Sequence, residues 1–160
     1  MASFGLDDNQ LIRLARTIGR ARGQGSFLAP LASFRLGLAS NGTSELVRDA
    51  LVATAARHGL SLECVTAGYD QALQDSLSSD SPLNRAEPEA VLIALDWRGL
   101  ALSPSPGDES SAKTAIDAAL DSIDAIRDAV RRNNGAVCIV QNLAPPPEAV
   151  FGSLDRRVEG

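Results

Sequence analysis

Short, mostly apolar runs alternate along this chain with longer stretches in which apolar residues recur at helical spacing. The short runs predict strands at 34–39, 61–66, 90–95 and 136–140. The longer stretches between them predict helices at 44–57, 69–78 and 110–132. Strands joined through helices pair in parallel, because each crossover returns the chain to the same end of the sheet. The alternation therefore predicts an α/β fold with a parallel sheet covered on both faces.

Right-handed crossovers restrict such a chain to a doubly wound, three-layer sheet of the flavodoxin-like kind. An amphipathic helix at 7–22 precedes the first strand, and its basic face is either solvated or available to a membrane or a partner. We expect residues 1–33 to form this helix and a linker, 34–142 the α/β domain, and 143–160 a proline-rich tail or a linker to a missing domain. Four strands leave room for a fifth, so we expect a truncated sheet whose exposed edge destabilises the chain or makes it self-associate.

Charge and composition exclude several classes of protein. The 160 residues carry 15 basic and 20 acidic side chains, a net charge of −5, whereas nucleic-acid-binding surfaces are densely basic. No apolar run approaches the roughly 18 residues of a membrane span, and the N-terminus lacks the basic and apolar regions of a signal peptide. Cys64 and Cys138 lie in apolar runs without metal-ligand spacing. We therefore expect a cytoplasmic chain with free buried thiols, no metal site, and neither nucleic acid nor membrane as partner.

Polar segments follow the predicted strands, and the carboxyl ends of parallel strands meet at one edge of a sheet, where ligands bind. Residues 67–70 follow the second strand. We predict that the ligand-binding residues come from the segments after the other three strands: Ser40, Asn41, Gly42, Thr43, Asp96, Arg98, Gln141 and Asn142.

Two alternatives stay open for each part of this site. The turn after the first strand leads into a helix whose free N–H groups could hold an anion, or else Ser40, Thr43 or Ser44 simply caps that helix. Arg98 could bind a phosphate or carboxylate while Asp96 holds it in place, or the two could only tie down their loop.

The only histidine, His58, falls at the end of the second predicted helix, beside Gly59. That helix runs back toward the amino edge of the sheet, so we expect His58 to interact with the helix end, away from the site. A Ser-His-Asp triad therefore cannot be assembled in this chain, and we predict no catalytic residue.

Four short motifs occur in a familiar order: RLGLASNGT at 35–43, AGYDQ at 67–71, DSPL at 80–83 and PEAVLIALDWR at 88–98. Together with Gln141-Asn142, they resemble the N-terminal domain of FkbH-type proteins of the HAD-like IIIC class, over about residues 34–142. The resemblance implies an SGNH-hydrolase-like fold. On this resemblance, Gly42 stands at the nucleophilic serine position, Arg98 stands at the oxyanion asparagine position, and the Asp-x-x-His motif has no counterpart.

The resemblance also implies a partner. FkbH-like proteins continue into a HAD-type catalytic domain with an Asp-x-Asp motif and magnesium, and are associated with loading a glyceryl or acyl unit onto an acyl carrier protein. This sequence has no such motif, so magnesium is expected only in a downstream HAD domain, which would act in cis or in trans.

The expected function is thus a non-catalytic accessory domain that binds a substrate or carrier. The alternatives are an SGNH-class esterase or thioesterase using Ser40 or Thr43, and a response-regulator-like switch. For the switch, Asp96 is suitably placed, but Lys113 lies in a predicted helix.

Overall fold

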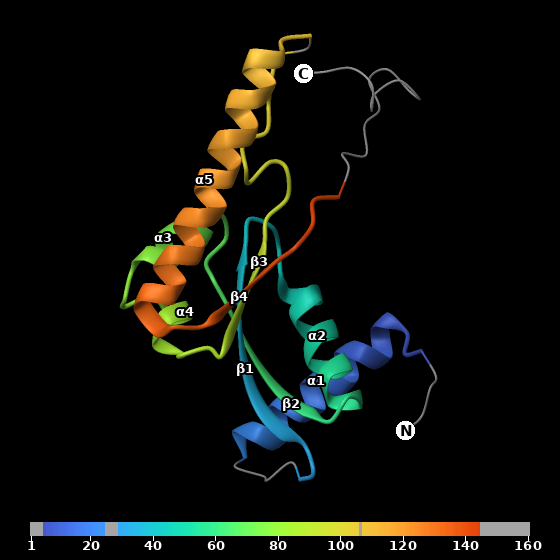
Figure 1. Cartoon of the computed structure of the whole chain (residues 1–160). Helices are drawn as coiled ribbons and strands as arrows, with labels where there is room; N and C mark the ends of the chain where they lie inside the picture. The colour runs from blue at the N-terminus through green and yellow to red at the C-terminus, as the bar shows by residue number, and fades with distance from the viewer. Residues whose placement is uncertain (1–4, 25–28, 106, 145–160) are drawn as a thin grey trace.

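The computed structural model describes residues 5–24, 29–105 and 107–144 of the chain. Its centre is a sheet of four parallel strands in the order β2-β1-β3-β4 (Figure 1). The strands are β1 (Ala32–Ser40), β2 (Leu60–Thr66), β3 (Ala90–Ala94) and β4 (Val137–Val140). This order is that of the first four strands of a flavodoxin-like sheet. The predicted α/β, doubly wound fold is confirmed.

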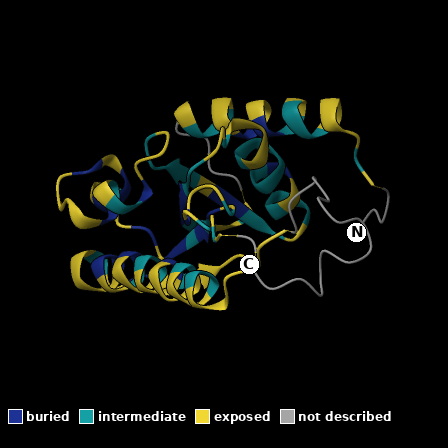
Figure 2. Ribbon diagram, turned by 90° about the horizontal axis from the view of Figure 1, so that it is seen from above, coloured by how far each residue is buried: buried dark blue, intermediate teal, exposed yellow. Residues whose placement is uncertain are grey.

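Helices cover both faces of the sheet. They are α1 (Asp8–Gly23), α2 (Glu45–Arg57), α3 (Ala72–Leu77), α4 (Pro82–Arg85) and α5 (Glu109–Asn134). Helix α2 lies on one face, whereas α3, α4 and α5 lie on the other (Figures 1 and 2). Helix α1 packs against α2 and forms an additional outer layer (Figure 2). The predicted basic helix at 7–22 therefore covers another helix.

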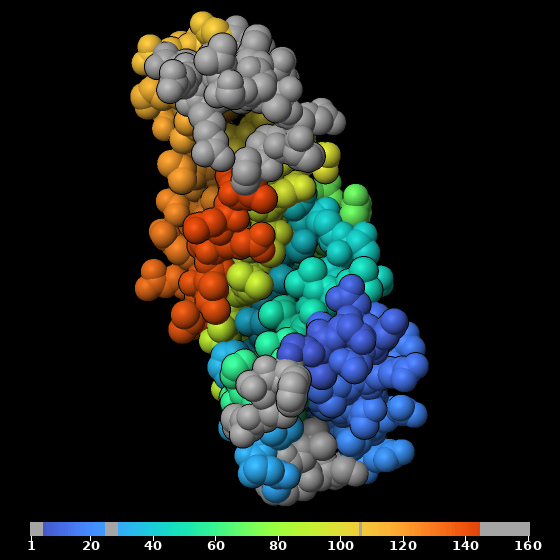
Figure 3. All heavy atoms as spheres, turned by 90° about the vertical axis from the view of Figure 1, so that its right-hand side faces the viewer, coloured from blue at the N-terminus to red at the C-terminus, as the bar shows by residue number. Residues whose placement is uncertain are grey.

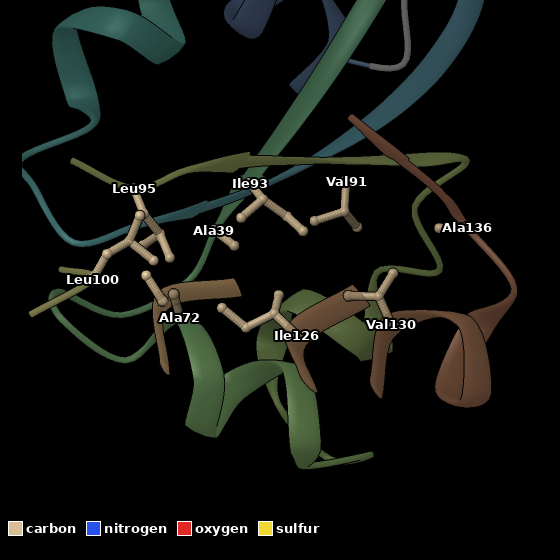
Figure 4. Packing of buried hydrophobic residues seen from close by; sticks show 10 residues of the cluster. Ala39, Ala72, Val91, Ile93, Leu95, Leu100, Ile126, Val130 and Ala136 are labelled. Carbon is tan, nitrogen blue, oxygen red and sulfur yellow. The ribbon is translucent and has the colours of Figure 1, made fainter. Parts of the chain in front are cut away.

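The larger core lies between the sheet and α5. Val91 and Ile93 of β3 face Ile126 and Val130 of α5, and all four side chains are at most 1% exposed (Figure 4). Each such side chain contributes about 1.5–3 kcal/mol when it is removed from water. A smaller core on the other face joins Leu36, Leu62 and Ala90 to the inner side of α2. The α5 face therefore contributes most of the packing.

Gly37 of β1 is required by the close approach of α4. A Cβ at this position would lie 2.7 Å from Leu83 Cδ1 and 3.0 Å from Val91 Cγ2. Leu83 is fully buried, so its side chain has no free space into which to move. The glycine thus allows α4 to lie directly on the central strand.

The chain between β2 and β3 differs from the sequence prediction. The helix predicted at 69–78 spans only Ala72–Leu77. Between it and β3 the structure has α4, which was not predicted and which begins with Pro82 and is capped by Ser81. Tyr69 and Leu77, near the two ends of the predicted helix, are 74% and 52% exposed, and Tyr69 lies outside the helix of the structure.

The long helix α5 ends at Gly135, whose φ of 69° is the left-handed conformation that glycine adopts without strain. Both cysteines are half-buried free thiols, and burial raises the pKa of Cys64 to about 11. No helix within the described ranges is long and apolar enough to cross a membrane. The predicted tail lies almost entirely outside the described residues.

Candidate functional site

A cavity of about 230 Å³ opens at the carboxyl edge of the sheet, between the ends of β1, β3 and β4. Six of the eight predicted residues line it: Ser40, Asn41, Gly42, Thr43, Asp96 and Gln141. Arg98 and Asn142 do not line it. The convergence follows from the parallel pairing of β1 with β3 and of β3 with β4, which brings their carboxyl ends side by side.

Asn41 and Asp96 join the loops after β1 and β3. The Asn41 side-chain amide donates to Asp96 Oδ1 at 2.7 Å, and the Asp96 backbone N–H donates to Asn41 Oδ1 at 3.0 Å. Two reciprocal hydrogen bonds define both the distance and the orientation of the loops. The pair therefore forms one wall of the cavity.

The backbone after β3 wraps around the same carboxylate. The N–H groups of Arg98 and Gly99 donate to Asp96 Oδ1 at 2.9 and 3.1 Å. The hydrogen bond from Asn41 is the main reason that the pKa of Asp96 lies below its usual value, and the two backbone donors and Arg98 act in the same direction. Asp96 is therefore ionised at neutral pH, and one of its oxygens is already fully engaged.

Arg98 lies beside Asp96, outside the lining of the cavity. Its guanidinium is 3.8 Å from Asp96 Oδ2 and stacks on the Trp97 ring, 4.7 Å from the ring centroid. The Arg98 side chain remains 65% exposed. These contacts orient the guanidinium without burying it, so its outer nitrogens stay accessible to an anion.

The start of α2 differs from the capping prediction. Ser44 occupies the N-cap position, but its side chain makes no capping hydrogen bond. The Ser40 hydroxyl accepts instead from the Gly42 backbone N–H at 3.1 Å, one turn earlier. Ser44 has helical backbone angles (φ −101°, ψ −2°), which differ from those of a side-chain-capped N-terminus. Ser44 therefore gives the first-turn N–H groups of α2 no side-chain partner, although it lines the cavity itself.

A second cavity, of about 250 Å³, lies on the opposite side of Asn41. Asp70, Gln74 and Ser122 contribute polar groups to its lining. Asp70 falls in the predicted segment after β2, and its positive φ of 54° marks a tight turn there. No sequence pattern marks Ser122 as a site residue, because only the packing of α5 across the sheet brings it to this cavity.

His58 lies at the far end of the molecule from this site. It is the C-cap residue of α2, and the carbonyl of Gly59 accepts from the N–H of Ala32, at the amino end of β1. The expected position of His58 is confirmed. Ser40 and Thr43 therefore have no histidine beside them, since the sequence contains only one.

Magnesium does not fit the residues at this edge. Asp96 is the only carboxylate that lines the first cavity, and its Oδ1 accepts three hydrogen bonds. Within the described ranges, no group of three or more histidine, cysteine, aspartate or glutamate side chains could hold a metal ion.

Comparisons with known proteins reveal a similar fold. No family model matches the sequence. No curated protein matches it either. Among solved structures, the chain is similar to the N-terminal part of the protein BF1531 from Bacteroides fragilis, described as containing a phosphatase domain complexed with Mg. The TM-score is 0.70 at 15% identity, over 97% of this chain and 38% of that chain. At this identity the likeness shows a shared fold, and the present chain spans well under half of the solved one.

Proposed function

We propose that this chain is a non-catalytic, SGNH-like accessory domain that binds an anionic substrate or the phosphorylated arm of a carrier protein. The binding site comprises Ser40 to Thr43, Asp96, Arg98, Gln141 and Asn142. The observation that carries the proposal is the reciprocal pairing of Asn41 with Asp96 in the lining of the cavity. The stacked, exposed guanidinium of Arg98 is 3.8 Å from Asp96, and Ser44 makes no capping hydrogen bond at the N-terminus of α2. A guanidinium and free helix N–H groups together favour a phosphate or carboxylate.

The resemblance to FkbH-type proteins supports the choice of partner. In such proteins the domain precedes a HAD-type catalytic domain, and the similar Bacteroides chain is described as containing a phosphatase domain. We propose that the present chain acts with a HAD-type domain, in cis or in trans, and presents a three-carbon phosphate or an acyl carrier arm to it. Magnesium would belong to that catalytic domain.

Ligand titration followed by amide NMR tests the proposal. We expect 3-phosphoglycerate or phosphopantetheine to shift the amide signals of residues 40–44 and 96–99. Arg98→Ala should weaken binding at least about tenfold, since a charge-assisted contact contributes roughly 1.5–3 kcal/mol. Arg13→Ala, on an exposed position of α1, should bind like the native chain. Unchanged spectra with both ligands would show that the cavity is structural.

A hydrolase is the second candidate, because Ser40 and Thr43 both line the cavity. Its nucleophile would need a base, and His58 lies at the opposite end of α2. We expect no turnover of p-nitrophenyl acetate or of an acyl thioester. Turnover that disappears in Ser40→Ala would favour the hydrolase over the accessory domain.

A further inference from the structure

A hollow of about 250 Å³ lies between the N-terminal ends of α1 and α2, and we call it the α1–α2 groove. Its lining is aliphatic apart from one carboxylate: Asp8, Leu11, Ile12, Leu46, Val47 and Ala50. Leu46 and Val47, in the first turn of α2, are 70% and 49% exposed. Figure 3 shows this side of the molecule, with the blue atoms of α1 against the teal atoms of α2. The packing of α1 on α2 thus leaves aliphatic surface uncovered here.

The α1–α2 groove adjoins the first cavity at Val47, which lines both. Because this side chain is half-exposed, a ligand in the first cavity can extend over it into the groove without displacing packed atoms. The boundary toward the second cavity is different. It is formed by Asn41, and a Cβ at Gly99 would lie only 2.6 Å from Asn41 Cγ. The first cavity is therefore closed at Asn41 and open toward α1.

The two volumes favour one ligand that occupies both hollows. The first cavity measures about 230 Å³ and the α1–α2 groove about 250 Å³. Pockets that bind small molecules usually measure about 300–1,000 Å³. Each hollow is smaller than this range by itself, whereas the two together fall within it. A ligand of ordinary size therefore needs polar groups that suit the first cavity and an apolar part that suits the groove.

The far end of the groove limits the length of the apolar part. Ile12 and Leu46 also line a larger cavity, of about 580 Å³. Charged side chains contribute to its lining: Arg16, Arg22, Glu45, Arg48, Asp49 and Glu63. An aliphatic chain that reaches these groups gains no further apolar contact. Leu46 and Ala50 are one turn of α2 apart, about 5.4 Å, a length that roughly four to six carbon atoms span.

We propose that the ligand of this chain is an amphiphilic anion. Its phosphate or carboxylate lies in the first cavity, and an aliphatic chain of roughly four to six carbon atoms lies in the α1–α2 groove. This inference rests on the proposed function and narrows it, because a bare three-carbon phosphate would leave the groove empty.

The first turn of α2 suits both parts of such a ligand. The first N–H group of the helix that donates to a backbone carbonyl is that of Arg48, to Ser44 at 2.8 Å. The N–H groups of Leu46 and Val47 precede this hydrogen bond, as donors at a helix N-terminus do, whereas their side chains line the groove. Polar donors and aliphatic side chains thus come from the same two residues, so the anionic group and the chain of one ligand are served side by side.

Isothermal titration calorimetry with n-alkyl phosphates tests the inference. From methyl to hexyl phosphate, we expect Kd to fall by up to about fourfold for each added methylene group, as burial of that group implies, and to level off in longer chains. Alkanoates of matched length show whether phosphate or carboxylate is preferred. Equal affinity for methyl and hexyl phosphate would overturn the inference and leave the proposed function in place. Absence of binding by every alkyl phosphate and alkanoate would overturn both.

Variants of α2 identify where the chain lies. Ala50→Phe fills the groove and should abolish the difference in affinity between methyl and hexyl phosphate. Leu46→Ser, which should reduce this difference, is the second variant if Ala50→Phe does not fold, as judged by circular dichroism. Leu120→Ser is the matched control, because it replaces a 55% exposed leucine on α5, across the sheet, and should change nothing. A difference that persists in both groove variants would overturn the inference. So would 1-hexanol binding as tightly as hexyl phosphate, because the chain would then bind without an anionic group.

Discussion

Asp96 shows how a single side chain organises the candidate site. It accepts from the side chain of Asn41 and from two backbone N–H groups of its own loop. The sequence places Asp96 at the end of a strand but does not indicate that Asn41 is its main partner. That contact joins residues 55 positions apart, and only the register of β1 and β3 creates it.

We predict that Asn41→Ala raises the pKa of Asp96 toward its ordinary value of 3.8, because the hydrogen bond that contributes most to lowering it is removed. In the native chain this contact stabilises the fold above that value and is lost as the pH falls through the lower, folded-state pKa. Asp96 is half-exposed, so its contribution is less than about 1 kcal/mol. Carboxyl NMR titration measures the shift, with Asn142→Ala as the control at the same edge. An unchanged pKa in Asn41→Ala would contradict the assignment.

Gly37→Ala should destabilise the chain by about 1–3 kcal/mol, because the added methyl group overlaps Leu83 in a filled core. Gly19 offers a matched control, since a Cβ there meets no atom within 4 Å on helix α1. Gly19→Ala should stabilise the chain by about 0.5–1 kcal/mol through helix propensity. Urea unfolding measures both variants, and a neutral Gly37→Ala would show that α4 can move away.

At the scale of elements, the positions of strands and long helices follow from periodicity, whereas short elements do not. The predicted strand at 90–95 and the predicted helix at 110–132 match β3 and α5 within about two residues. Helix α4 has only four residues and no periodic pattern, so its sequence resembles a loop. It is held by tertiary contacts instead, chiefly those of Asn84.

Asn84 joins α3, α4 and α5 in one network. Its side-chain amide lies within 2.8–3.1 Å of the carbonyls of Asp75, Ser76 and Ser78, and its carbonyl accepts from Asn134 at 2.8 Å. We predict that Asn84→Ala destabilises the chain by about 2–3 kcal/mol, because several buried groups lose their partner. Thermal unfolding measures this loss. Asn133→Ala removes fewer hydrogen bonds, so it should lower the free energy of unfolding by less than Asn84→Ala does. A larger loss in Asn133→Ala would contradict the role of Asn84 in the network.

At the scale of the whole molecule, the sequence predicts the edge of the sheet at which polar residues gather. It does not predict that this edge holds two separate cavities. Periodicity and crossover rules lead to the parallel order, and the order brings six of the eight predicted residues to one cavity. The second cavity depends on how α5 crosses the sheet, which no local pattern records. Likewise, α1 could be predicted as a helix, yet its packing on α2 depends on tertiary contacts.

Hydrogen exchange should follow the strand order. Strands β1 and β3 are paired on both sides, so their amides should open only when the whole domain unfolds. Strands β2 and β4 are each paired on one side, but β4 has only four residues, of which Val137, Ile139 and Val140 are exposed, so its amides should exchange fastest among the strands. Mass-spectrometric exchange on peptides covering each strand measures this order. Equal protection of β3 and β4 would contradict it.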